Sequence, residues 1–185
     1  MSREDYGALN RLFKDDGAAV PEIIWSPSED QLDIPVQVEL LRYWQRIGGT
    51  GRFPAADAID PLDMKFALGY LMLIDVLEDG SDFLYRLYGS SIALHYGQDM
   101  TGRRTSEFSG RIGIFFRAVY RASMLRRSSI FTVHEPPKHV FVKRWRRLVL
   151  PLVDADGAIV RFLVCNIPED RARGIGIPKV GKRGV

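Results

Sequence analysis

The stretch YLMLIDVLEDGSDFLYRLYGSSIALHYGQDMTG, residues 70–102, decides the fold. It holds two apolar runs, residues 71–77 and 83–88, on either side of the polar residues 78–82. This order is typical of a β-hairpin. The segment that follows, residues 89–97, begins and ends with glycine and predicts a helical turn. We expect the rest of the chain to complete the sheet that this hairpin starts or to cover its face.

Length and composition describe a globular protein. The chain has 185 residues, of which 46% are hydrophobic and 11% aromatic, enough for one domain with extensions. Asp75 interrupts the longest apolar run, and no segment approaches the roughly 20 residues that cross a bilayer. The N-terminal residues contain no apolar signal segment. Cys165 is the single cysteine, which excludes an internal disulfide and fits a reducing compartment. We therefore expect a cytoplasmic protein without membrane contact.

Charge is distributed unevenly along the chain. The formal net charge is +3, but residues 1–35 carry a net charge of −5 and residues 36–185 one of +8. The acidic segment 1–35 and the basic segment 36–185 either attract each other within one molecule, or the acidic segment is an unattached tail. Both arrangements fit the pattern.

Two helices are predicted from apolar spacing. Residues 36–47 repeat apolar side chains at helical intervals, after Pro35 and before a glycine pair. Residues 111–127 predict the main helix, with apolar and arginine-rich faces. Residues 1–20 are weakly patterned and allow one amphipathic turn. Residues 23–25, Ile-Ile-Trp, either cover an edge of the core or contact a second subunit.

Three further strands complete the order of elements. They are expected over residues 129–135, 140–153 and 158–167, and the turn sequence Asp-Ala-Asp-Gly at 154–157 joins the last two. The strands do not alternate with helices, which disfavours a parallel sheet. We predict an α+β fold: a five-stranded antiparallel sheet with a helical insert on one face and an N-terminal helix.

Three segments follow from this order. Residues 1–35 are an N-terminal arm, residues 36–168 form the domain, and residues 169–185 are a basic, flexible tail.

Five short motifs resemble those of PAS domains, in particular a bacterial branch of stand-alone single-domain PAS proteins. They are Leu-Arg-Tyr-Trp at 41–44, Pro-x4-Ile-Asp-Pro at 54–61, Arg-Leu-x-Gly at 86–89, Gly-x-Asp-x-Thr-Gly at 97–102 and Leu-Pro-Leu at 150–152. The asparagine that usually follows the second PAS strand is absent.

This resemblance implies a non-catalytic sensory or regulatory module in signal transduction. PAS domains commonly enclose a cavity between sheet and long helix, where a small molecule binds, and many act through a partner protein. Here the output would belong to a separate signalling protein. Many also form homodimers through a helix before the sheet. The stripe Leu40, Leu41, Trp44 and Ile47 is the candidate interface, although it fits packing on its own sheet equally well.

Six residues are candidates for contact with a pocket ligand. They are Arg86, Tyr88, His95, Tyr96, Phe116 and Tyr120. An arginine inside an apolar strand, such as Arg86, faces solvent, pairs with an acid such as Asp75 on the neighbouring strand, or contacts an anionic ligand.

The sequence does not identify a cofactor. Haem-binding PAS domains use a histidine on the long helix, and residues 111–127 contain none. Covalent flavin photochemistry needs a cysteine in the helical insert, whereas Cys165 lies in the last strand, so only non-covalent flavin stays open. His95, His134 and His139 lack metal-ligand spacing, and the last two are expected at exposed positions.

Two alternatives come from other classes of protein. A small cone-shaped isomerase or dehydratase would need an acid–base pair, for example Asp75 with His95 or Tyr120. A nucleic-acid binder would use Lys138 and the basic run 143–147. Strand alternation sends that run's charges to opposite faces, so nucleic-acid binding is disfavoured.

Overall fold

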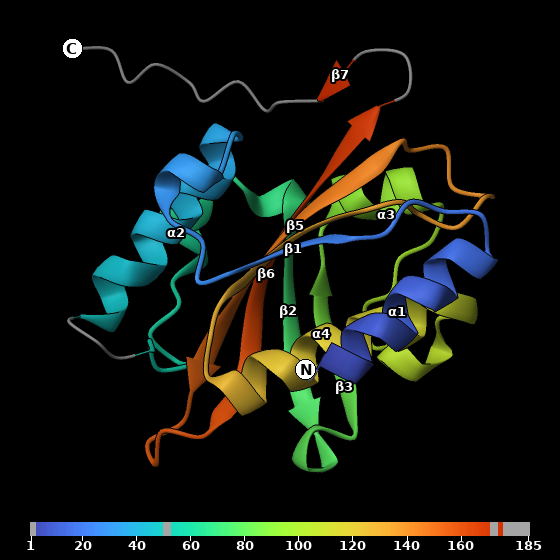
Figure 1. Ribbon diagram of the computed structural model, residues 1–185. Coiled ribbons are helices and arrows are strands. Elements are labelled where there is room, and N and C mark those ends of the chain that lie inside the picture. The colour runs from blue at the N-terminus through green and yellow to red at the C-terminus, as the bar shows by residue number, and fades with distance from the viewer. Residues whose placement is uncertain (1–2, 50–52, 171–173, 176–185) are drawn as a thin grey trace.

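A computed structural model describes residues 3–49, 53–170 and 174–175, which form one sheet between two layers of helices (Figure 1). The helices are α1 (Arg3–Asp15), α2 (Pro35–Gly48), α3 (Ser90–Tyr96) and α4 (Gly110–Arg126). The strands are β1 (Glu22–Trp25), β2 (Leu71–Leu77), β3 (Asp82–Tyr88), β4 (Ile130–His134), β5 (Arg144–Val153), β6 (Ile159–Asp170) and β7 (Gly174–Ile175). Short 3-10 turns are η1 (Glu29–Gln31), η2 (Pro61–Met64), η3 (Leu68–Tyr70), η4 (Glu78–Gly80) and η5 (Thr105–Glu107).

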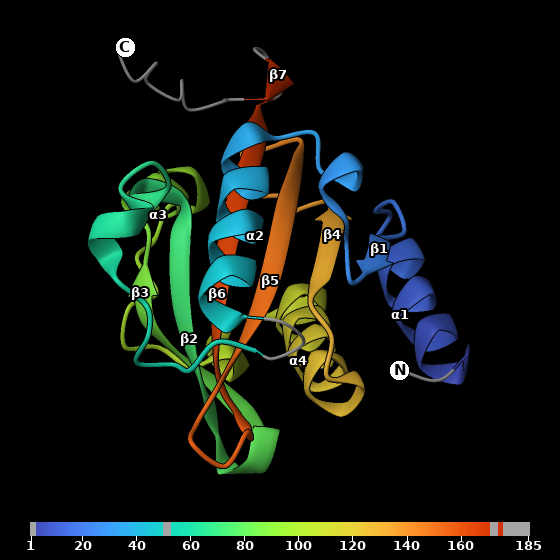
Figure 2. The same cartoon turned by 90° about the vertical axis from the view of Figure 1, so that its left-hand side faces the viewer.

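The predicted α+β fold is confirmed. The strands follow the order β1-β4-β5-β6-β2-β3, and every neighbouring pair is antiparallel (Figure 2). The hairpin strands β2 and β3 share this sheet with the three later strands. Two strands were not predicted: β1 pairs with β4 at one edge, and β7 pairs with β6. The sheet therefore has seven strands, not five, over the part of the chain that the structure describes.

The sheet buries both faces. Alternation along β5 directs Trp145 and Val149 towards α4, and Leu148 and Leu150 towards α2. Helices α1, α3 and α4 lie on one side of the sheet and α2 on the other (Figure 1). The predicted helical lid over the sheet is confirmed by α4.

Helix α2 packs against its own sheet. Leu40 and Leu41 are buried with β5 and β6 side chains, Ile47 is partly buried against the same cluster, and the Trp44 indole N–H donates to the carbonyl of Pro151 at 2.8 Å. Intramolecular packing therefore occupies the stripe proposed as a dimer interface. A homodimer stays a prediction.

The N-terminal arm is more ordered than the sequence predicted. Residues 3–15 form a helix rather than a single turn, because Leu9 and Phe13 are buried against the face of α4. The Phe13 and Phe115 rings meet edge to face with centroids 5.3 Å apart. Residues 23–25 cover the edge of the core as strand β1, which is one of the two roles considered for them. A long-range contact thus stabilises a helix that local propensity leaves marginal.

Opposite charges join the acidic arm to the basic body. Asp16 pairs with Arg111, Asp33 with Arg146 at 3.0 Å, and Glu29 with Arg42 at 2.9 Å. The uneven charge distribution therefore reflects attraction within one molecule. None of the helices within the described ranges is long and apolar enough to span a bilayer.

The domain boundary predicted at residue 168 lies inside a strand. β6 continues to Asp170, and the Glu169 carboxylate is buried between Lys143 at 3.1 Å and Arg144 at 3.0 Å. The rest of the predicted flexible tail, apart from β7, lies outside the described residues.

Candidate functional site

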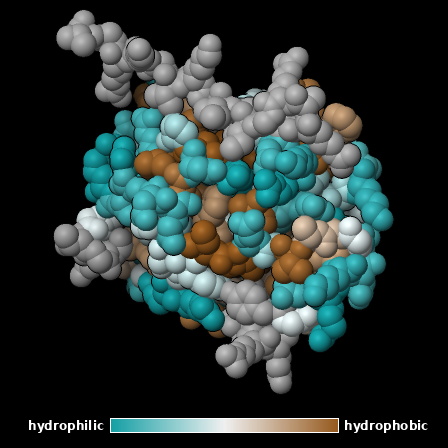
Figure 3. Space-filling model, turned by 45° about the horizontal axis from the view of Figure 1, so that its top comes forward, coloured by the Kyte–Doolittle hydropathy of each residue, from teal (hydrophilic) through white to brown (hydrophobic). Residues whose placement is uncertain are grey.

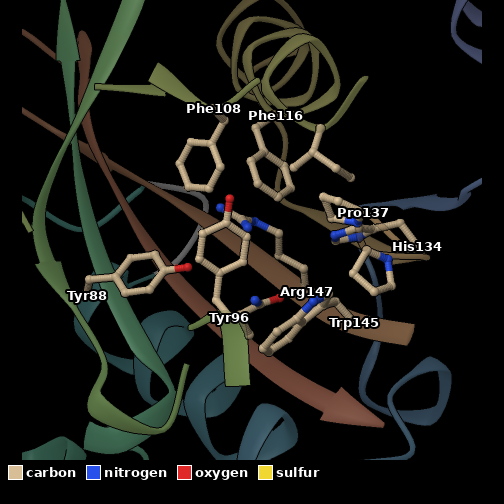
Figure 4. Close-up of a pocket in the computed structure, with 11 residues that line it drawn as sticks. Tyr88, Tyr96, Phe108, Phe116, His134, Pro137, Trp145 and Arg147 are labelled. Carbon is tan, nitrogen blue, oxygen red and sulfur yellow. The ribbon is translucent and has the colours of Figure 1, made fainter. Parts of the chain in front are cut away.

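A small cavity lies between the sheet and α4 (Figure 4). Its volume is about 20 Å³, which is room for about one water molecule. Its walls come from the sheet, from α3 and α4, and from the segment between β4 and β5. The lining residues are Tyr88, Tyr96, Phe108, Ile112, Phe116, His134, Pro136, Pro137, Trp145, Arg147 and Asn166.

A row of polar side chains crosses the α4-facing side of the sheet, and two of its members, Arg147 and Asn166, line the cavity. In the strand register Thr132 of β4 lies opposite Arg147 of β5, and Arg147 lies opposite Asn166 of β6. Directly opposed residues of antiparallel strands bring their side chains within about 5 Å on the same face. All three are buried. The sheet thus places a polar strip under an otherwise aromatic lid.

Arg147 is the central residue of this strip. Its side chain is almost fully buried, with 2% of its surface exposed. The guanidinium carbon lies 4.0 Å from the centre of the Phe116 ring, and an Nη atom donates to the hydroxyl of Tyr120. No described acidic residue lies within ion-pair distance of it. Arg147 is therefore a buried cation without a protein counter-ion in this part of the chain.

Three buried polar atoms at the cavity have no hydrogen-bond partner among the residues described. They are Arg147 Nε, His134 Nε2 and Asn166 Oδ1. A buried donor or acceptor without a partner costs about 1–3 kcal/mol, and native proteins pair most such groups. Because three such atoms lie around one cavity, this cavity is the candidate site.

Burial keeps the titratable groups of the cavity neutral. It lowers the pKa of His134 well below 6.5, and the positive charges of Arg147 and Arg111 lower it further. Burial also raises the pKa of the Tyr88 hydroxyl above its ordinary value. Near neutral pH the cavity therefore presents one permanent charge, that of Arg147, and several neutral polar groups.

The structure brings four of the six predicted ligand contacts to this region. Tyr88, Tyr96 and Phe116 line the cavity, and Tyr120 adjoins it through Arg147. Figure 4 shows the hydroxyls of Tyr88 and Tyr96 and the side chain of Arg147 directed towards the space between the walls. His95 lies just behind the wall, with its ring centroid 6.4 Å from that of Trp145.

Arg86 lies apart from the cavity. Its side chain is 62% exposed and pairs with Asp75, which also accepts from Arg161 at 2.6 Å. Burial raises the pKa of the Asp75 carboxyl, but hydrogen bonds from both arginines outweigh this effect and lower it below its ordinary value. The salt bridge to Asp75 was one of the three roles considered for Arg86.

The acid–base pair of the enzyme alternative does not assemble. Ile74 packs in the α4-facing core, so the next residue, Asp75, points to the opposite face of the sheet. Tyr120 lies in the α4-facing core, and the His95 ring lies near that of Trp145 in the same core, with centroids 6.4 Å apart. Asp75 is therefore separated by the sheet from both Tyr120 and His95.

The residues that carry the three unpartnered atoms, Arg147, His134 and Asn166, were not among the predicted ligand contacts. Strand alternation along the basic run 143–147 predicts that Arg147 shares one face of the sheet with Trp145 and that Arg146 lies on the other face. Asn166 stands as a polar residue inside the apolar strand sequence LVCNI, which is the available signal for it. His134 was expected at an exposed position, and this was wrong: it is 2% exposed, because the rings of Phe115 and Phe116 on α4 pack against it.

The basic run does not form a continuous positive surface. Lys143 and Arg144 pair with Glu169, Arg146 pairs with Asp33, and Arg147 is buried. Within the described ranges, no group of three histidine, cysteine or acidic side chains could hold a metal ion.

The arrangement defines the class of the protein. An antiparallel sheet with a helical insert across one face, and a small cavity between them, is the arrangement expected of a PAS-like α+β domain. A family model described as PAS domain matches residues 32–165, and the chain belongs to this family.

Comparisons with solved structures and with curated proteins add no further assignment. A solved structure of an RNA-binding Light-Oxygen-Voltage receptor is similar over 67% of this chain, with 14% sequence identity and a TM-score of 0.43. The chain spans 38% of the length of that structure. No curated protein matches the chain.

Proposed function

We propose that this PAS domain is a non-catalytic sensor in which a small molecule enters the cavity between sheet and α4 and changes the position of the N-terminal arm. The observation that carries this proposal is that the arm is attached to the walls of the cavity. A change in those walls therefore acts on α1 and β1.

Arg111 provides the first attachment. It follows the start of α4, next to the cavity residue Ile112, and one Nη atom donates to the carbonyl of Pro136 at 2.7 Å. Pro136 itself lines the cavity. The same guanidinium pairs with Asp16 and lies 5.1 Å above the ring of Phe13. One side chain thus contacts both the cavity wall and the arm.

Strand β1 provides the second attachment. It pairs with β4, whose last residue is the cavity residue His134. The backbone N–H of Ala19 also donates to the carboxylate of Glu135 at 3.1 Å. A ligand that favours one position of β4 would shift the arm only if it binds the two conformations with unequal affinity.

A separate signalling protein is the proposed receiver of this change. Apolar side chains gather across the middle of one face of the molecule, between hydrophilic ones (Figure 3). Contiguous exposed apolar surface commonly marks a contact with another protein.

A ligand screen with two matched variants tests the sensor proposal. Small fragments that raise the unfolding temperature of the full chain are retested on Ile112→Phe, which adds roughly the volume of the cavity, and on Ile114→Phe. Ile114 lies on the same helix but is 45% exposed and outside the cavity. Hits are expected to bind Ile114→Phe and the wild type, to fail on Ile112→Phe, and to change hydrogen exchange over residues 7–25. Equal binding to Ile112→Phe, or unchanged exchange in the arm, would contradict the proposal.

A further inference from the structure

The charge of Arg147 needs a counter-ion that the described residues do not supply. Taking a guanidinium out of water is unfavourable unless a negative group and hydrogen bonds offset the lost hydration. Other arginines in the sheet have such groups: Arg146 pairs with Asp33 and Arg161 with Asp75. Around Arg147 the described residues supply ring faces and the neutral hydroxyls of Tyr120 and Tyr85, but no acidic group.

The groups around Arg147 match a flat acceptor with two oxygens. Arg147 Nε is an N–H donor without a partner among the described residues. The amide of Asn166 can present its NH2 group to the cavity if it turns over. His134 Nδ1 lies 3.5 Å from the Thr132 hydroxyl, and when Nδ1 accepts from this hydroxyl, Nε2 carries a proton and can donate.

We propose that the cavity binds a small organic monocarboxylate, whose carboxylate accepts from Arg147 and from the polar groups of Asn166 and His134. This inference rests on the proposed sensor function and assigns the chemical class of its ligand. The apolar remainder of the ligand would contact Phe108, Phe116 and the proline segment.

Charge and shape favour a carboxylate over other anions. The cavity offers one permanent positive charge, which a monocarboxylate neutralises, whereas a phosphate near neutral pH brings up to two negative charges. Arginine also binds planar carboxylates with two parallel hydrogen bonds. The walls are mainly aromatic and proline side chains, so they suit an apolar body rather than a sugar or a nucleotide.

The size of the cavity requires a wall to move. With room for about one water molecule, the cavity admits a carboxylate only if part of its lining is displaced. Pro136 and Pro137 belong to a segment without helix or strand structure between β4 and β5. Arg111 holds this segment to α4 and to the arm. Entry of the ligand is thereby coupled to the arm.

Paired probes of equal shape test the carboxylate inference. The full chain is titrated with acetate, butyrate and benzoate, with the corresponding amides, and with inorganic phosphate, at neutral pH and constant ionic strength. Thermal unfolding and tryptophan fluorescence report binding, since Trp145 lines the cavity. At least one carboxylate is expected to bind about ten-fold or more tightly than its amide.

Variants assign the effect to Arg147. Arg147→Met is expected to abolish the preference for the carboxylate. Arg146→Met removes the neighbouring charge from the opposite face of the same strand and should keep the preference. If Arg147→Met fails to fold, Asn166→Ala retains the charge and should weaken carboxylate binding several-fold.

The outcomes separate the two proposals. Equal binding of amides and carboxylates would overturn the carboxylate inference and leave the sensor proposal standing. Equal binding of phosphate would likewise overturn it, because the site would then accept anions in general. It is also overturned if no carboxylate binds, or if binding survives in Arg147→Met.

Discussion

Arg147 and Asn166 lie directly opposite each other on β5 and β6, both buried, and each carries a polar atom without a hydrogen-bond partner among the described residues. Buried polar groups in a sheet normally satisfy one another or are replaced by apolar residues. Such a pair facing a cavity is a feature that stability alone does not explain. The predictions below test whether these and the neighbouring residues serve binding or folding.

Arg147→Met is expected to leave the ligand-free protein as stable as the wild type or more stable. Methionine removes the cost of a buried, unpaired charge, while loss of the bond to Tyr120 costs about 1 kcal/mol. Urea unfolding measures the difference. In the control Arg146→Met the ion pair with Asp33 is lost, so stability should fall. A fall of more than about 2 kcal/mol for Arg147→Met would show that Arg147 is a structural residue.

His134 is expected to make the protein less stable as the pH falls. Its pKa is well below 6.5 in the folded state, because burial and two arginines oppose its charge, whereas the unfolded chain takes up a proton near 6.5. Unfolding therefore binds a proton below this pH, and stability declines. Between about pH 7 and pH 5.5 the loss is about 1 kcal/mol from this one group.

The variant His134→Gln should remove this part of the pH dependence. Unfolding free energies at both pH values, compared with those of the exposed-site control His139→Gln, measure the effect. If His134→Gln and wild type lose the same stability on acidification, His134 is not held neutral in the folded protein.

The hairpin and the main helix were predictable because their signals are local. The strands expected at 71–77 and 83–88 are Leu71–Leu77 and Asp82–Tyr88, and the helix expected at 111–127 is Gly110–Arg126. Gly97 ends α3 with φ of 88°, as its position after a helical turn predicted.

The cavity could not be predicted in the same way. Alternation shows which residues share a face, but not which of those faces are closed by a distant segment. Arg147 is buried because Phe116, Tyr120 and the β4–β5 segment cover it, and these contacts depend on tertiary packing. Helix α1 was missed for the same reason: its partner Phe115 is about a hundred residues away in sequence.

Asp82 is expected to hold the insert to the sheet. Its carboxylate accepts from the Thr105 hydroxyl at 2.7 Å, the Ser106 hydroxyl at 2.6 Å and the Phe83 N–H at 2.9 Å. Burial raises its pKa, but these hydrogen bonds outweigh burial and lower it, so the stabilisation is present above about pH 4 and is lost as the pH falls further.

Asp82→Asn should therefore cost about 2 kcal/mol at neutral pH. Asp99→Asn changes an exposed aspartate of the same insert and should cost less than about 1 kcal/mol. Chemical denaturation compares the two variants. If both variants lose the same free energy of unfolding, the hydrogen bonds of Asp82 contribute no more to stability than those of the exposed Asp99.

Asp16→Asn is expected to loosen the arm without unfolding the domain. The Asp16 carboxylate is 48% exposed, so its pair with Arg111 contributes less than about 1 kcal/mol to overall stability. It is nevertheless a contact between the end of α1 and α4. Hydrogen exchange over residues 7–25 should become faster, with no change in β5 and β6. The adjacent variant Asp15→Asn serves as the control, and the same exchange in both variants would argue against this attachment.

Gly89→Ala is expected to be strongly destabilising although its φ of −56° suits any residue. A Cβ at this position would overlap the carbonyl group of Gly69 and lie 2.9 Å from the carbonyl oxygen of Leu71, and backbone atoms cannot rotate away. The cost of such overpacking is about 3 kcal/mol. Gly7→Ala offers the opposite case, since its Cβ would lie 3.9 Å from Arg11 in a helix and should stabilise by about 0.5–1 kcal/mol. Thermal unfolding of both variants measures these effects. A mild effect of Gly89→Ala would mean that Gly89, the last residue of the Arg-Leu-x-Gly motif, is needed only for backbone flexibility and not for the close approach of the backbone.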